Sequence, residues 1–124
     1  MKKDRALYNF WQQFSIPFYP VTALPPAKDI VFPYGTYEPI FGYNGDITYP
    51  SVNIYDLTES EARINGYAAE IGEVIGMGGT IVKCDEGVMW IKRGSPFVQG
   101  INDPDNSNIK RRLISIAIEF LTTD

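Results

Sequence analysis

Few residues of this chain could do covalent chemistry, because the sequence has no histidine and a single cysteine, Cys84. A Ser-His-Asp triad, a Cys-His pair and an imidazole general base are therefore excluded. One thiol without imidazole also cannot fill a tetrahedral zinc site. The apolar neighbours of Cys84 predict a buried, inert thiol. We expect no catalytic residue, no cofactor and no metal site.

Two polar segments have the composition of ligand-binding loops. The run Gly76-Met77-Gly78-Gly79 would suit a phosphate, but it ends a predicted helix, whereas a phosphate loop precedes one. Asp103 and Asp105 are spaced as in a calcium loop, but the glycine at position six and the glutamate at position twelve are missing. We interpret the first segment as a helix C-cap and the second as a solvated turn.

Two segments show helical periodicity. In residues 4–14 the apolar stripe consists of Leu7, Phe10, Trp11 and Phe14. It predicts an amphipathic helix docked on the body or, because it is so aromatic, on another subunit. The run Thr58-Glu59-Ser60-Glu61 has the pattern of a capping box and predicts a second helix from residue 58 to the glycine run. Gly66 and Gly72 inside that helix predict close packing on a sheet.

The other regular elements are predicted to be strands. Residues 32–41 and 47–57 flank an Asn-Gly turn and predict one hairpin, and residues 80–84 and 88–93 predict a second one. Residues 109–121 alternate apolar and polar side chains, which predicts a long last strand with Ile114, Ile116, Ile118 and Phe120 on one face.

Two irregular segments complete the chain. Residues 15–31 contain four prolines and predict an extended connector. Residues 94–108 predict a loop that is long for a compact domain, and such loops are usually functional or disordered.

Together these elements predict an α+β fold with a mostly antiparallel sheet of about five strands, two flanking helices and a long loop before the last strand. We expect one domain over residues 1–124, with an N-terminal helix (1–14), a proline-rich extended segment (15–31) and an α+β core (32–124). A net charge of −4 argues against a protein that coats nucleic acid. Neither a signal peptide nor a membrane span is evident.

Basic residues gather at both borders of the predicted loop. Five of the eleven lysines and arginines are there, namely Lys92, Arg93, Lys110, Arg111 and Arg112. We expect them to cluster in space, either as solvated surface charge or as partners of acidic groups on a neighbouring subunit. Abundant tyrosine and phenylalanine also favour an interface, because aromatic residues and arginine are typical anchors there.

The segments 90–99, 103–105 and 109–114, with residues 31–37 upstream, resemble small tail-completion proteins of long-tailed phages and prophages. These are minor structural proteins of the tail terminator or minor capsid type. The resemblance covers residues 31–121 and is one of residue pattern, without a catalytic motif.

This resemblance implies a homo-oligomer, commonly a hexameric ring, that caps the tail tube and offers a surface to the head. The implied partners are further copies of the chain, the major tail tube protein and the head-tail connector protein, while DNA passes through without specific binding. The implied location is the head-proximal end of the virion tail, after assembly in the bacterial cytoplasm. The expected interface residues are Lys92, Arg93, Pro96, Phe97, Gln99, Asp103, Asp105, Lys110, Arg111 and Arg112.

Two alternatives remain open at the level of sequence. Within the same class, the chain would be a head-tail joining protein or another minor virion protein. In a different class, it would be a small-molecule binding domain or an enzyme of unknown substrate. The terminator hypothesis predicts that Arg93→Glu combined with Arg111→Glu leaves the fold intact and blocks assembly.

Overall fold

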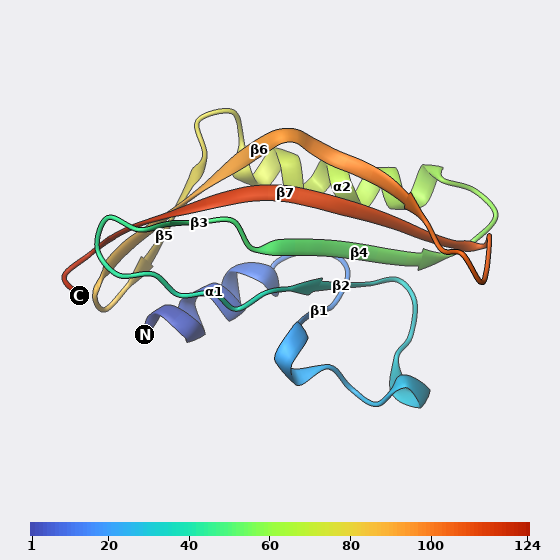
Figure 1. Ribbon diagram of the computed structural model, residues 1–124, viewed down its shortest axis with the longest axis horizontal. Coiled ribbons are helices and arrows are strands. Elements are labelled where there is room, and N and C mark those ends of the chain that lie inside the picture. The colour runs from blue at the N-terminus through green and yellow to red at the C-terminus, as the bar shows by residue number, and fades with distance from the viewer.

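The computed structural model describes residues 1–124 as two helices and a curled sheet (Figure 1). The first half contains α1 (Lys3–Trp11), β1 (Phe18–Pro20), the 3-10 turns η1 (Val21–Ala23) and η2 (Ala27–Asp29), β2 (Tyr34–Tyr37), β3 (Ile47–Thr48) and β4 (Ser51–Leu57). The second half contains α2 (Ala62–Ile75), β5 (Thr80–Cys84), β6 (Gly87–Asn102) and β7 (Ile109–Thr122). The α+β class is confirmed.

Helix α1 buries the predicted aromatic stripe within the chain itself. Leu7 and Trp11 are each 1% exposed. The Trp11 ring lies 5.0 Å from that of Phe18 and stacks on Tyr37 at 5.8 Å. Aromatic pairs in this range add to the stabilisation from area burial. The alternative of a stripe packed on another subunit is therefore wrong.

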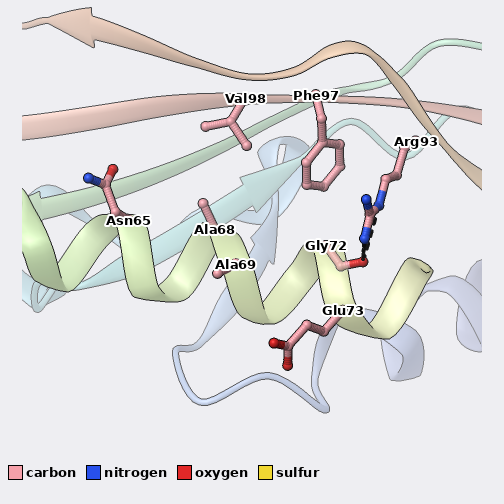
Figure 2. Close-up of a pocket in the computed structure, with 8 residues that line it drawn as sticks. All are labelled: Asn65, Ala68, Ala69, Gly72, Glu73, Arg93, Phe97 and Val98. Atoms are coloured by element: carbon pink, nitrogen blue, oxygen red, sulfur yellow. Dashed lines mark hydrogen bonds between the residues drawn. The ribbon is translucent and has the colours of Figure 1, made fainter. Parts of the chain in front are cut away.

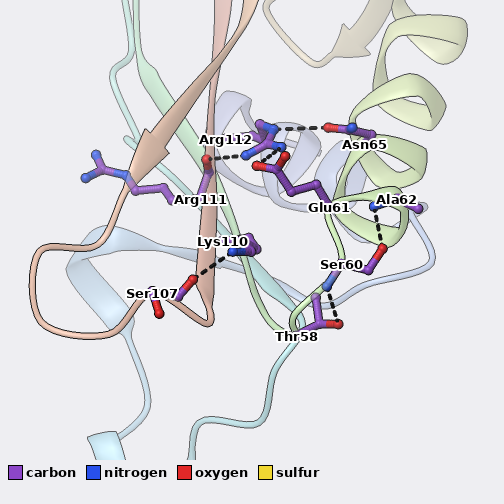
Figure 3. Close-up of polar contacts among 9 residues, drawn as sticks. All are labelled: Thr58, Ser60, Glu61, Ala62, Asn65, Ser107, Lys110, Arg111 and Arg112. Carbon is purple, nitrogen blue, oxygen red and sulfur yellow. Dashed lines mark hydrogen bonds and ion pairs between the residues drawn. The ribbon is translucent and has the colours of Figure 1, made fainter.

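Helix α2 begins four residues later than the capping box predicted. The Ser60 hydroxyl accepts a hydrogen bond from the Ala62 amide at 3.2 Å, and Thr58 caps the turn before it (Figure 3). Glu61 does not reach back to the first turn, because its carboxylate pairs with Arg112. A tertiary ion pair therefore replaces the predicted local capping box.

The two glycines of α2 have different surroundings. A Cβ at Gly72 would lie 3.1 Å from the ring of Phe97, so the predicted close packing is confirmed there. A Cβ at Gly66 would meet nothing within 4 Å, so the same prediction is wrong at Gly66.

The sheet has seven strands and is mixed. Its order is β1-β2-β4-β7-β6-β5, and β3 pairs with β7 beyond the end of β4. All pairs are antiparallel except β1 with β2. Two differences explain why the sequence predicted about five strands: the prolines around β1 indicated a connector, and the predicted strand 47–57 is divided into β3 and β4. A three-residue edge strand tolerates such flanks, since it needs donors on one side only.

The predicted loop 94–108 is mostly strand, and this prediction is wrong. Strand β6 continues to Asn102, leaving only residues 103–108 as the turn before β7. Arg93 pairs with Ile116 and Val98 pairs with Ile114, so four residues bulge opposite one. A bulge and an edge position accommodate Pro96, whose ring lacks an amide donor.

Both helices pack on one face of the sheet. A single cluster of twenty buried residues joins their apolar faces to alternate residues of the strands, including Ile114, Ile116, Ile118 and Phe120 as predicted. The odd-numbered residues of β7 from Leu113 to Glu119 lie on the opposite face, which no helix covers, and are half-buried. Cys84 is also half-buried rather than fully buried, and its thiol is free.

Candidate functional site

All ten expected interface residues lie on one long hairpin. Strand β6 carries Lys92, Arg93, Pro96, Phe97 and Gln99, the turn carries Asp103 and Asp105, and β7 carries Lys110, Arg111 and Arg112. The hairpin runs along α2 and forms the longest part of the sheet (Figure 1).

The five basic residues nevertheless do not cluster. Arg93 faces Ile116 across the sheet, whereas Arg111 lies five positions earlier on the same strand. At 3.3 Å per residue this separates the two groups by about 16 Å. The expected basic patch does not form. Residues 94–102 continue as a strand instead of closing a loop, so they keep the two groups of basic residues apart.

Arg112 holds the beginning of α2. Its side chain is 7% exposed, and its guanidinium donates to Asn65 and to the Glu61 carboxylate, each at 3.1 Å (Figure 3). The same helix end is tied to β4 by a second ion pair, from Arg63 to the fully buried Asp56. That carboxylate holds the pKa of Arg63 above its usual value, chiefly by hydrogen bonding.

Arg93 holds the other end of α2. Its guanidinium donates to the Gly72 carbonyl in the last turn, and lies 5.5 Å from the centre of the Phe97 ring (Figure 2). A cation is favourable at this position because carbonyls at a helix C-terminus carry partial negative charge. Arg93 and Arg112 therefore clamp the helix onto the hairpin.

The remaining cations of the hairpin also have partners within the chain. Lys92 pairs with Glu119 at 2.7 Å and lies over the ring of Trp90. Arg111 donates to the Asn53 side chain at 2.9 Å, and Lys110 donates to the carbonyl of Ser107 at 2.7 Å. None of the five basic side chains is left without a hydrogen-bonding partner.

The acidic residues of the turn stabilise it locally. The Asp103 carboxylate accepts hydrogen bonds from the amides of Asp105 and Asn106 at 2.8 and 3.1 Å. Short polar side chains commonly stabilise turns in this way. Asp105, Pro96 and Gln99 have no side-chain hydrogen bond and are exposed.

Between α2 and β6 lies a groove of about 450 Å³, which we call the α2 groove (Figure 2). Ala68, Ala69 and Gly72 form its floor on the helix, while Phe97 and Val98 project toward them from β6. Glu73 and Arg93 are its only ionisable side chains. Arg93 already binds the helix, so no acid–base pair faces this groove.

The outer side of β6 is unpaired next to the α2 groove. Strand β5 pairs with β6 only from Gly87 to Ile91. The segment Lys92 to Asn102 pairs with β7 on one side, except at the bulge of residues 94–97, and with no strand on the other, and we call it the free edge. Sequence reasoning missed this edge because it predicted a loop there.

Ion pairs also fasten the two chain termini. The N-terminal ammonium pairs with Asp85, and Lys3 pairs with Asp124 at 2.8 Å. These hydrogen-bonded cations hold the pKa values of Asp85 and Asp124 below their usual range. Elsewhere, burial is the main cause that raises the pKa of Tyr37 to about 12.

No cluster of three or more potential metal-ligating side chains exists in the chain, and neither helix is long and apolar enough to cross a membrane. No protein-family model matches the sequence, and neither the curated proteins nor the solved structures contain a significant match.

Proposed function

We propose that this chain is a structural subunit of a phage or prophage tail, a terminator that forms a ring at the end of the tail tube and provides the head-attachment surface. The observation that carries the proposal is the free edge of β6 beside the α2 groove. An unpaired strand edge is a template for a strand from another chain, and an adjacent groove can receive its side chains.

The free edge is protected over only half of its length. Natural proteins block strand edges with prolines and bulges, and here Pro96 and the four-residue bulge block residues 94–97. Residues 98–102 pair regularly with β7 and carry neither device. An edge and a separate receiving surface make a head-to-tail contact, and such contacts close into rings when the rotation allows it.

The charge distribution suits a subunit through which DNA passes. The chain carries a net charge of −4, and its five hairpin cations are engaged internally. Phosphate binding grows with the number of free lysines and arginines, so an acidic chain that engages five of its eleven cations would hold sliding DNA less tightly. The proposed partners are further copies of the chain, the major tail tube protein and the head-tail connector protein.

Electron microscopy of tail tubes tests this function. Tubes polymerised from the major tail protein of the same genome should stop growing when the chain is added, with a ring at one end. Binding to isolated head connectors without any effect on tubes would favour a head-tail joining role instead. Tubes that grow normally and stay bare would contradict both roles.

Hydrogen exchange tests the free edge itself. Amides of residues 98–102 that lack a partner on β7 should exchange fast in the isolated subunit and become protected in the assembly. Equal exchange in both states would show that another surface makes the contact.

A further inference from the structure

A second segment offers groups that nothing in the chain satisfies. Residues 21–31, which we call the proline arm, leave the sheet at β1 and return at β2, projecting beyond that edge (Figure 1). No strand pairs with the arm, and no side-chain hydrogen bond or ion pair joins it to the body. Three of its large apolar side chains face solvent, with Val21, Leu24 and Val31 at 42%, 44% and 75% exposed, while Pro25 and Ile30 are half-buried.

Between its two 3-10 turns, the arm has residues with the backbone angles of a polyproline II ligand. Leu24 has φ −70° and ψ 140°, and Pro26 has φ −53° and ψ 146°. The ideal values are about −75° and 145°. Segments already in this conformation lose little entropy on binding, and they dock in grooves lined by aromatic rings.

Such a groove exists on the same chain, between α1 and the segment after β2. This α1 pocket has a volume of about 380 Å³. Tyr8, Tyr37 and Phe41 give it aromatic walls, and Asp4 and Arg5 add one charge of each sign. Tyr37 is 3% exposed, and its hydroxyl has no hydrogen-bonding partner within the chain. It is therefore a donor available to a ligand carbonyl.

We propose that the proline arm of one copy docks in the α1 pocket of the next copy. Leu24, Pro25 and Pro26 would fill the aromatic part of the pocket. The charges that follow them on the arm, Lys28 and Asp29, match the opposite charges of Asp4 and Arg5. None of these four side chains forms an ion pair within its own chain.

The position of the pocket makes the contact directional. Pro20 and Thr22, at the root of the arm, form part of the pocket wall, so a docked arm touches the root of the next arm. The docking part of the arm, residues 24–29, and the pocket are different surfaces, which gives a head-to-tail interface able to continue around a ring. This inference deepens the proposed function and depends on it only for the closure of the ring.

A charge exchange between two variants tests the contact. Lys28→Glu places a glutamate against Asp4, and Asp4→Lys places a lysine against Lys28. Each variant alone should self-associate at least about tenfold more weakly than the native chain, because like charges then meet at the interface. An equimolar mixture should recover native association, because every arm can then find a pocket of opposite charge. Sedimentation equilibrium measures all three samples.

Charge reversals at two other exposed positions provide the controls. Lys83→Glu and Glu59→Lys change exposed residues that form no ion pair, and both should associate like the native chain. If the arm and pocket variants also behave like the native chain, or if their mixture shows no recovery, the arm contact is wrong.

If the native chain is monomeric at micromolar concentration, cysteine cross-linking at higher concentration tests the same contact. In a Cys84→Ser background, Leu24→Cys mixed with Tyr8→Cys at millimolar concentration should form an intermolecular disulfide when oxidised glutathione is added as the oxidant, giving a covalent heterodimer. Absence of this heterodimer would overturn the arm contact.

The tail-tube assay separates the arm contact from the terminator function. If Lys28→Glu caps tail tubes like the native chain, the arm contact fails while the terminator function stands. If the native chain does not cap tubes, the terminator function itself fails.

Discussion

The β6–β7 hairpin and the proline arm differ in where their interacting groups are satisfied. The hairpin concentrates charge, and its basic side chains are bound within the chain to α2, β4 and neighbouring strand residues. The arm has little charge, yet Val21, Leu24 and Val31 are exposed and its two charged side chains form no ion pair. Groups left unsatisfied, which are the backbone of the free edge on β6 and the side chains of the arm, and not local density of charge, therefore indicate where a second chain binds.

The strongest test of this difference reverses two hairpin charges. Arg93→Glu with Arg111→Glu was expected from sequence to leave the fold intact. With both guanidinium groups engaged internally, we now expect a loss of about 3 kcal/mol in the free energy of unfolding, from charged hydrogen bonds and a carboxylate at the C-terminal end of α2. Urea denaturation measures it. A native unfolding midpoint would mean that these contacts contribute nothing and that the hairpin charges are available to partners.

A single deletion in the hairpin should have a smaller effect. Arg112→Ala removes the hydrogen bonds to Glu61 and Asn65 and should lower the free energy of unfolding by about 2 kcal/mol. Arg112→Met keeps the buried stem and serves as the control for lost packing. If the alanine and methionine variants unfold like the native chain, the clamp on α2 is not a stabilising contact.

Acid should weaken the ion pairs at the two chain termini and leave the arm unchanged. Asp85 and Asp124 have lowered pKa values in the folded chain, so their contribution is present above pH 4 and is lost as the pH falls below it. Protection factors, which correct for the pH dependence of intrinsic amide exchange, should therefore fall in α1 and at the C-terminus below about pH 4. Asp85→Asn should remove part of this dependence at the N-terminus. A loss of amide protection confined to residues 21–31 would contradict the conclusion that the termini are ion-paired and the arm is not.

The smallest effect on stability is expected in the arm. Leu24→Ser changes an exposed side chain that makes no polar contact, so the free energy of unfolding should stay within about 0.5 kcal/mol of the native value. Self-association should weaken instead. A large stability loss measured by urea denaturation would show that the arm packs on its own body and is not available to a neighbour.

Local pattern predicted much of the fold. The stripe of α1 and the alternation along β7 depend on the burial of one face, and both are confirmed. Three predictions were wrong because contacts between residues distant in sequence override the local pattern. The Glu61 carboxylate pairs with Arg112 instead of capping α2, an edge position accommodates Pro96 and the glycines of β6, and pairing with β2 makes part of the proline-rich segment into β1.

The candidate surfaces were harder to predict than the fold. The sequence singled out the lysines and arginines at the borders of a predicted loop, but the partners of the three arginines are distant in sequence, and Arg93 binds a backbone carbonyl that leaves no mark in the residue pattern. The α1 pocket combines side chains from α1, the arm root and the segment after β2, so no local motif indicates it. The four prolines of residues 15–31 were the only signal for the arm, and they equally predict a connector.

The central claim is that this chain closes into a ring through head-to-tail contacts. Native mass spectrometry of the unmodified protein over a range of concentrations tests it most directly. We predict one closed oligomer of fixed number, commonly six, in equilibrium with the monomer and without a series of longer species. A strict monomer up to millimolar concentration, or an open-ended ladder of oligomers, would contradict the claim.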